Sequence, residues 1–223
     1  MSREIKDAIY GQLAIITKAL SSPKRLEIIE LLSQGEKSVE TIAEQASLGI
    51  KNSSAQLKEL KSAGLINSRR NGKFVYYRLA NDSITGLWRY LSQFAQGHLG
   101  ELQKIMLESL SAPEALEQVS RKELLLRAKR KEIILIDVRP NDEYETAHLP
   151  FAMSIPASEL AKHLRSLPKN KEIVAYCRGP YCFLAKEAVE VLRRKGFKAS
   201  RLQDSVHDWK SYGLPLEGKS INV

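Results

Sequence analysis

The sequence predicts two domains of different classes: a mainly helical domain with a β-hairpin over residues 1–111, and an α/β domain with a central parallel sheet over residues 112–223. Three observations predict this division. The first half carries apolar residues at helical spacing, followed by an Asn-Gly turn between two strand-like segments. The second half alternates apolar strand-like runs with helical patterns. A cluster of basic residues lies between residues 51 and 78, whereas both cysteines lie in the second half.

The composition is that of a soluble globular chain. Its 223 residues include 43% hydrophobic residues, enough for two modest cores. There is no long uncharged apolar run and no apolar signal region at the N-terminus, so no membrane partner is expected. Two cysteines without an export signal indicate a reducing, cytoplasmic location and argue against a disulfide scaffold. The net charge of +9 permits a polyanionic partner.

Four helices are expected before residue 64. The first, over residues 4–20, has apolar side chains three and four positions apart. Pro23 opens the second, which ends at Gln34-Gly35. Ser38 is the expected N-cap of a third helix over 39–45. The fourth runs from about residue 51 to residue 63 and ends at Gly64.

The third and fourth helices, separated by the tight turn Leu48-Gly49, form a helix-turn-helix pattern. In such a pair the second helix enters the major groove of DNA by its N-terminal residues. Its Ala55, Leu57 and Leu60 are expected to face the core. The side chains expected to contact bases and phosphates are Lys51, Asn52, Ser53, Ser54, Gln56 and Lys58.

Two short strands, over residues 65–70 and 73–79, flank Asn71-Gly72, which is a strong hairpin signal. Arg69, Arg70 and Lys73 surround this tip, so the hairpin is expected to bind backbone phosphate as the wing of a winged helix. From residue 51 to residue 78 seven basic residues accompany a single acid, Glu59. The alternative, a solvated charged surface, is weaker because pattern, turn and charge agree on DNA binding.

A long helix is expected from Asp82 to about Ser111, with apolar positions along its length. An isolated domain has little use for so long an apolar face. Pairing with the same helix of a second subunit, and with residues 4–20, would bury it. We therefore expect a homodimer, which also suits a palindromic operator. His98 has no other ligand type spaced with it, so no metal site is expected.

Three segments in this order resemble the ArsR family of bacterial repressors over about residues 5–110: LSSPKRL at 20–26, SSAQLKEL at 53–60 and AGLI at 63–66, followed by the hairpin. The resemblance implies a dimer that binds double-stranded operator DNA and represses transcription. Gln56 stands where the family often has His. Metal-sensing members carry a cysteine pair in the helix before the recognition helix. Residues 39–45 contain none, so arsenic or zinc sensing at that place is not implied.

After a boundary at Ala112-Pro113, helical and strand-like segments alternate. Helices are expected at 117–130, 158–164 and 183–195, and strands at 133–139, 173–176 and 199–202. This alternation predicts an open parallel sheet with helices on both faces. Ligand sites in such sheets lie at the C-terminal ends of the strands, where Asp137 and Cys177 both fall.

The two cysteines bound a six-residue loop, Cys177 to Cys182, that follows a buried strand and opens a helix. The loop N–H groups, the helix N-terminus and Arg178 all favour negative charge there. Cys177 is therefore expected to ionise readily and to act as a nucleophile.

Residues 115–220 resemble a rhodanese domain through IDVR at 136–139, EY at 143–144, HLP at 148–150, IP at 155–156, the cysteine loop, Trp209 and GLP at 213–215. Rhodaneses move sulfane sulfur through a cysteine persulfide. The resemblance thus makes Cys177 the nucleophile of a loop completed by Arg178, Gly179, Pro180, Tyr181 and Cys182. It also implies that Asp137 and Arg139 hold the neighbouring strand end by ion pairing. Arg178 is expected to attract an anionic sulfur donor, and no cofactor is expected.

The chain departs from the family pattern at a few turns. Asp204-Ser205 replaces a Gly-Gly pair, and Ala147 and Phe151 stand where Gly is usual, so turn geometry and pocket shape are expected to differ. A phosphatase loop also opens a helix, but it is one residue longer and ends in an Arg that clamps phosphate. This chain has Phe183 at that position, which disfavours phosphate chemistry.

Two alternatives stay open. Cys182 either fills the last loop position as a small residue or resolves a persulfide on Cys177, giving a disulfide or polysulfide bridge. The second domain either senses sulfane sulfur from thiosulfate, polysulfide or another persulfide and thereby controls DNA binding, or is a turnover sulfurtransferase while another signal governs DNA binding.

Overall fold

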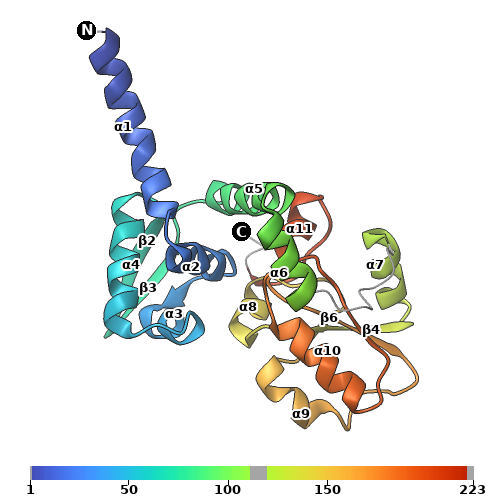
Figure 1. Ribbon diagram of the computed structural model, residues 1–223. Helices are drawn as coiled ribbons and strands as arrows, with labels where there is room; N and C mark the ends of the chain where they lie inside the picture. The colour runs from blue at the N-terminus through green and yellow to red at the C-terminus, as the bar shows by residue number, and fades with distance from the viewer. Residues whose placement is uncertain (1, 111–119, 220–223) are drawn as a thin grey trace. The chain divides into compact units, whose positions relative to one another are not determined.

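The computed structural model describes residues 2–110 and 120–219 of the chain. The chain divides into two compact units, Met1–Ala95 and Gln96–Val223 (Figure 1). The domain boundary expected at residues 111 and 112 lies outside the described residues, as does the first part of the helix expected over 117–130.

The first unit combines helices with a three-stranded antiparallel sheet of order β1-β3-β2. Its elements are α1 (Ser2–Leu20), α2 (Pro23–Ser33), β1 (Lys37–Ser38), α3 (Val39–Gln45), α4 (Ile50–Ser62), β2 (Ile66–Asn71), β3 (Phe74–Leu79) and the greater part of α5 (Ser83–His98). The core consists of buried apolar side chains from these elements: Ala19, Ile28, Ile29, Leu32, Ile42, Leu57, Leu60, Leu65, Ile66 and Ile84.

Local signals place the helix-turn-helix as expected. The Ser38 side chain accepts a hydrogen bond from the backbone N–H of Thr41 at 3.2 Å and so caps α3. Gly64, with φ of 71°, follows the end of α4 in the left-handed conformation that glycine adopts without strain. The helix-turn-helix and the hairpin after it are therefore confirmed.

The hairpin differs from the prediction in detail. Asn71 pairs with Phe74, so Gly72-Lys73 forms the two-residue turn in place of Asn71-Gly72. Gly72 supplies the positive φ of 58° that this turn needs. Strand β1 was not expected; it has two residues, too few for a periodic pattern, and pairs with β3 through Lys37 and Ser38.

The prediction of one long helix from Asp82 to about Ser111 is wrong. The structure has two helices, α5 and α6 (Gly100–Leu110), with Leu99 between them. Apolar residues continue at helical spacing across the break, which is why the pattern concealed it. Gly97 and Gly100 flank the interruption, and glycine is a poor helix former because of its backbone freedom.

The second unit is built on a four-stranded sheet of order β5-β4-β6-β7 in which all strands are parallel. After α6 its elements are α7 (Arg121–Lys129), β4 (Ile133–Asp137), α8 (Asn141–Thr146), β5 (Met153–Ser154), η1 (Ala157–Glu159), α9 (Leu160–His163), β6 (Glu172–Tyr176), α10 (Leu184–Arg194), β7 (Ala199–Arg201) and α11 (Val206–Ser211). The parallel sheet is confirmed. The sequence analysis missed β5, α8 and α11, which have at most six residues each, and the helix expected over 158–164 is η1 followed by α9.

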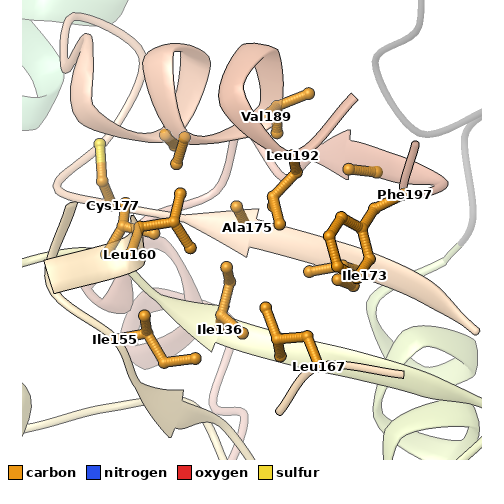
Figure 2. Packing of buried hydrophobic residues seen from close by; sticks show 14 of the residues in the cluster. Ile136, Ile155, Leu160, Leu167, Ile173, Ala175, Cys177, Val189, Leu192 and Phe197 are labelled. Carbon is orange, nitrogen blue, oxygen red and sulfur yellow. The ribbon is translucent and has the colours of Figure 1, made fainter. Parts of the chain in front are cut away.

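Successive side chains of the central strands enter opposite cores. On one face Ile136 of β4 and Ala175 of β6 pack with Leu192 of α10, as Figure 2 shows. On the other face Leu135 and Val174 belong to a second cluster, with Leu124 and Ala128 of α7 and the fully buried Trp209 of α11. Helices thus cover both faces of the sheet, as the apolar runs predicted.

A close backbone approach near the end of the described chain predicts a measurable cost. Gly218 has φ of 132°, and a Cβ atom there would lie 2.6 Å from the carbonyl oxygen of Thr146. We expect Gly218→Ala to lower the free energy of unfolding by about 2–4 kcal/mol through strain and crowding. Gly196→Ala is the matched control, because Gly196 has a φ of 79° with open space around it and should cost only about 1–2 kcal/mol. Equal losses for the two variants in urea denaturation would contradict the crowding argument.

Candidate functional site

The two cysteines lie in the sulfur loop, defined here as residues 177–182, between the end of β6 and the start of α10. They form a disulfide, with 6.5 Å between their Cα atoms. Cys177 is 2% exposed and stands at the carboxyl end of β6, at one end of the buried row in Figure 2. Inside the loop the N–H of Cys182 donates to the carbonyl of Gly179 at 3.2 Å. The position of Cys177 at a strand end of the parallel sheet is as predicted.

Gly179 gives the sulfur loop its shape. Its φ of 145° lies in a region that residues with a Cβ atom rarely adopt, and a Cβ placed there would meet the Cβ of Ser205 at 3.7 Å. Ser205 is one of the two residues that replace the expected Gly-Gly pair. Its side chain caps α11 by accepting from the N–H of Asp208, whose carboxylate accepts in return from the N–H of Ser205.

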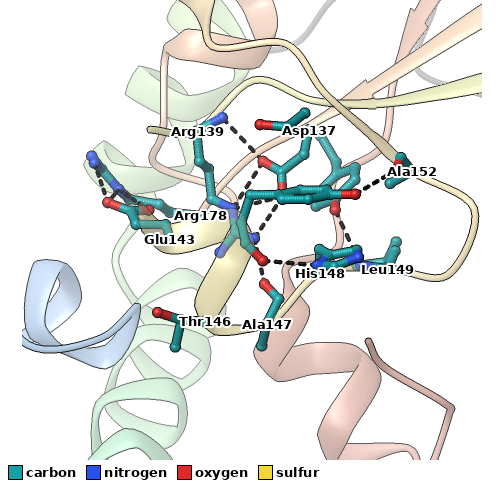
Figure 3. Close-up of polar contacts among 12 residues, drawn as sticks. Asp137, Arg139, Glu143, Thr146, Ala147, His148, Leu149, Ala152 and Arg178 are labelled. Carbon is teal, nitrogen blue, oxygen red and sulfur yellow. Dashed lines mark hydrogen bonds and ion pairs between the residues drawn. The ribbon is translucent and has the colours of Figure 1, made fainter. Parts of the chain in front are cut away.

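Arg178 is not a free cation. Its guanidinium donates to both carboxylate oxygens of Glu143 on α8, at distances between 2.7 and 3.1 Å, and the Glu143 side chain is 1% exposed. The two formal charges therefore compensate each other (Figure 3). Glu143 could not be assigned this role from the sequence, because nothing local indicates a partner 35 positions away.

Asp137 and Arg139 pair with each other at the end of β4 (Figure 3). The Arg139 guanidinium donates to Asp137 at 2.6 Å and to the carbonyl of Ala147 at 2.7 Å, and both charged side chains are at most 1% exposed. Burial alone would lower the pKa of Arg139, but hydrogen bonding and attraction to Asp137 outweigh it and leave the pKa raised. Burial, reinforced by the charge of Asp137, raises the pKa of Tyr176 well above its ordinary value.

Two further contacts fix the loop from outside. The hydroxyl of Tyr181 accepts a hydrogen bond from Nε2 of Gln96 at 2.8 Å. Nη2 of Arg201, at the end of β7, donates to the carbonyls of Gly179 at 3.2 Å and Pro180 at 3.0 Å. Sequence reasoning missed Arg201, since it read residues 199–202 only as a strand.

The N-terminal part of α4 presents most, not all, of the side chains expected to contact DNA. Lys51, Asn52, Ser54 and Lys58 are exposed. Gln56 is half-buried; its Nε2 donates to Asn52 and its Oε1 accepts from Arg25. The expected contact by Ser53 is wrong: its side chain is fully buried on the same face as Leu57 and Leu60, while Ala55, expected in the core, is exposed.

The hairpin of β2 and β3 exposes three cations near its tip, but they are not equivalent. Arg69 makes a bidentate ion pair with Glu36 and lies over the ring of Tyr76 at 5.0 Å. The hydrogen bond to Glu36 is the main reason that the pKa of Arg69 is raised. Arg70 donates to the carbonyl of Gly72, and Lys73 lies over the Phe74 ring at 5.3 Å. Arg70 and Lys73 therefore keep their charge available for phosphate.

Two general properties of the described residues complete the description. Within residues 2–110 and 120–219, no three His, Cys, Asp or Glu side chains are grouped so that they could hold a metal ion. None of the described helices combines the length and the apolar character that crossing a membrane requires.

Comparison with known proteins agrees with both halves of this architecture. Residues 22–68 match the model of the family described as bacterial regulatory protein, arsR family. Residues 120–212 match the model of the rhodanese-like domain. The HTH-type transcriptional regulator Rv0324 of Mycobacterium tuberculosis is 40% identical over 212 residues, which cover 95% of this chain and 93% of that protein. The chain belongs to the ArsR family of transcriptional regulators and carries a rhodanese-like domain.

Three partial similarities accompany this match. The Biofilm growth-associated repressor of Xylella fastidiosa is 37% identical over 79 residues, 35% of this chain and 69% of that protein. The Putative sulfur carrier protein YrkF of Bacillus subtilis is 32% identical over 76 residues, 34% of this chain and 40% of that protein. A solved homodimeric winged helix-turn-helix DNA-binding domain from Mycobacterium bovis is 40% identical, with a TM-score of 0.41 over 43% of this chain and 89% of its own.

The departures of this ArsR-family regulator from the rhodanese pattern have local explanations. Phe151, which stands where Gly is usual, keeps a glycine-like φ of 65° and is 49% exposed. Ala147 has φ of −163°, an extended conformation that any residue adopts. Ser205 takes over as the cap of α11.

Proposed function

We propose that this ArsR-family regulator is a homodimeric repressor whose affinity for operator DNA falls when sulfane sulfur reacts with Cys177 and Cys182 then closes a disulfide with it. The observation that carries the proposal is the pair Cys177 and Cys182, joined within one loop at the carboxyl end of a parallel sheet, on the same chain as a winged helix-turn-helix. A buried cysteine at a strand end, on a short loop that leads into α10, suits nucleophilic chemistry with an anionic product.

In the first step the Cys177 thiolate attacks the outer sulfur of a persulfide R–S–SH. An S–S bond forms to Cys177, the S–S bond of the donor breaks, and the thiolate R–S⁻ leaves. With thiosulfate as donor, sulfite leaves in its place. The product is a Cys177 persulfide, which is anionic at neutral pH and is stabilised by N–H donors in the loop.

In the second step Cys182 resolves the persulfide. Its thiolate attacks the γ-sulfur of Cys177, the Cys177–Cys182 bond forms, and hydrosulfide leaves. The two thiols lose two electrons, and the sulfane sulfur gains them to become sulfide. The disulfide between Cys177 and Cys182 supports this step, because the Cα separation of 6.5 Å lies within the range that disulfides span.

The proposed dimer explains an apolar stripe on α1. Ile5, Ile9 and Leu13 follow one another at intervals of four, and each is more than half exposed. Figure 1 shows that α1 projects from the rest of the first unit. Phe94 on α5 is also half exposed. Packing these faces against a second copy would remove them from water, at about 25 cal/mol per Å² of apolar surface.

The test measures DNA binding and sulfur capture together, by gel shift with the duplex upstream of the protein's own gene and by intact-protein mass spectrometry. We expect polysulfide to lower the DNA affinity of the reduced wild-type protein by about tenfold or more, the usual size of an allosteric coupling. Cys182→Ser should gain one sulfur atom but keep its DNA affinity. Cys177→Ser, matched to it in chemistry, should neither gain sulfur nor respond.

An unchanged DNA affinity after full conversion to the disulfide would refute the sensor. A turnover sulfurtransferase is the second candidate, favoured by the similarity to a putative sulfur carrier protein. Rapid sulfur transfer from thiosulfate to cyanide, together with a constant DNA affinity, would establish that candidate instead.

A further inference from the structure

Three arginines lie in or around the sulfur loop, and carboxylates compensate the charge of two of them. Arg178 is paired with Glu143, and Arg139 is paired with Asp137. Neither pair adds net charge to the surroundings of Cys177. The positive charge that the sequence placed at Arg178 is thus cancelled by a buried carboxylate.

Arg201 is different. It is the last residue of β7, in register with Ala175 of the neighbouring strand, and is only 4% exposed. Among the described residues it donates to carbonyls alone: those of Gly179 and Pro180 in the loop, and that of Leu110, at 3.2 Å, at the end of α6. Its Nε atom is buried and has no hydrogen-bond partner in the described part of the chain.

A buried guanidinium without a carboxylate is uncommon because its desolvation is not repaid by ion pairing. Burial indeed lowers the pKa of Arg201 from its ordinary value. Such a residue destabilises the fold unless an anion forms or binds close to it during the protein's function. The proposed chemistry creates two such anions, the thiolate and the persulfide of Cys177. Cys177 precedes Gly179, whose carbonyl Arg201 binds, by two residues.

We propose that Arg201 is a positioning residue that supplies the sulfur loop with positive charge that no described carboxylate compensates, and so stabilises negative charge on Cys177, an inference that rests on the proposed persulfide chemistry. It acts in two ways. By binding the carbonyls of Gly179 and Pro180, it holds these negative dipole ends away from the loop interior. Its charge also lowers the free energy of an anion on Cys177 relative to the neutral thiol.

The elements that adjoin the loop carry other charged groups. On the sheet and around it these are the pair of Asp137 and Arg139 on β4, the pair of Glu172 on β6 with Arg127, the pair of Glu143 and Arg178, and the pair of Arg121 on α7 with Asp204. On the helices they are Asp208, which caps the N-terminus of α11, and on α10 Glu187 and the pair of Lys186 and Glu190. All these remain unchanged in the Arg201 variants, so a shift in the acidity of Cys177 reports on Arg201.

The experiment measures the pKa of the Cys177 thiol from the pH dependence of its alkylation by iodoacetamide. Every protein is the full chain carrying Cys182→Ser, so that one thiol reacts. We expect Arg201→Gln to raise the thiol pKa by about one unit, and Arg201→Lys, which keeps the charge, to stay within about 0.3 of the parent. The matched control is the double variant Glu143→Gln with Arg178→Gln, which removes a neutral pair and should also shift the pKa by no more than about 0.3.

Three outcomes would overturn the proposal: no shift in Arg201→Gln, equal shifts in Arg201→Gln and Arg201→Lys, or a shift in the double control as large as that in Arg201→Gln. Circular dichroism checks the fold of each variant. If Arg201→Gln does not fold, Arg201→Met, which brings no polar group of its own into the buried site, takes its place with the same expected shift. Because the assay contains neither sulfane sulfur nor DNA, its result is independent of whether the persulfide sensor itself is correct.

Discussion

Replacing Asp137 by alanine is expected to lower the free energy of unfolding of the rhodanese-like unit by about 3–5 kcal/mol, the cost of leaving a buried cation without its partner. The Arg139 side chain is 1% exposed, and the carbonyl of Ala147, which also accepts from it, carries no charge that could replace the carboxylate. Water cannot replace the carboxylate without opening the core beneath β4. Urea denaturation followed by Trp209 fluorescence measures the loss, in a Trp88→Phe background that silences the other tryptophan.

The matched control for Asp137 removes both charges. Asp137→Leu with Arg139→Met replaces the pair by apolar side chains, and it should cost clearly less than Asp137→Ala, because no charge is left buried alone. A loss below about 1 kcal/mol for Asp137→Ala would mean that Arg139 finds another anion or reaches solvent.

Replacing Arg70 and Lys73 by alanine is expected to weaken operator binding about a thousandfold at 0.1 M salt, if the four cations of the proposed dimer each contact a phosphate. The slope of log K against log salt should become shallower by about 3–4 for the same reason. Because phosphate contacts carry no sequence information, binding to unrelated duplexes should weaken in parallel. Fluorescence anisotropy titrations at several salt concentrations give both quantities.

Two comparisons sharpen the wing experiment. Arg69→Ala should have a smaller effect than Arg70→Ala, since the charge of Arg69 is already compensated by Glu36. Lys195→Ala with Lys198→Ala changes the net charge by the same amount on exposed positions of the rhodanese-like unit, and should leave the salt slope unchanged. If the wing variant and this control behave alike, only net charge matters and the wing does not bind phosphate.

Features with a strong local signal could be predicted from the sequence. The apolar runs at residues 133–137 and 172–176 indicated buried parallel strands, because strands buried on both faces carry few polar residues. A cysteine at the end of such a run had to lie at the carboxyl edge of the sheet. Likewise Gly72, next to Asn71, indicated a tight hairpin. Which two residues form its turn was decided by the pairing of the strands and not by residue type.

The sequence-based predictions were wrong where contacts with residues distant in sequence, and not the residue type itself, determine the structure. Ser53 is buried because it precedes Leu57 by one helical turn, and a small hydroxyl side chain gives no apolar signal of this position. Continuous apolar spacing concealed the break at Leu99. The pairing of Glu143 with Arg178 and the contacts of Arg201 join segments more than 20 positions apart, so only the fold could reveal them.

The place of Cys177 in the sheet restricts how far a chemical event at its sulfur can travel. Strand β6 is hydrogen-bonded to β4 on one side and to β7 on the other, and its side chains are locked in both cores. We therefore expect the backbone of β6 to stay in place when the bond between the cysteines forms or breaks. The change in backbone conformation that accompanies closing or opening the bond to Cys182 must instead occur after β6, in the first turn of α10 and at the loop carbonyls that Arg201 binds. Amide hydrogen-exchange rates should differ most between reduced and oxidised protein in these two places.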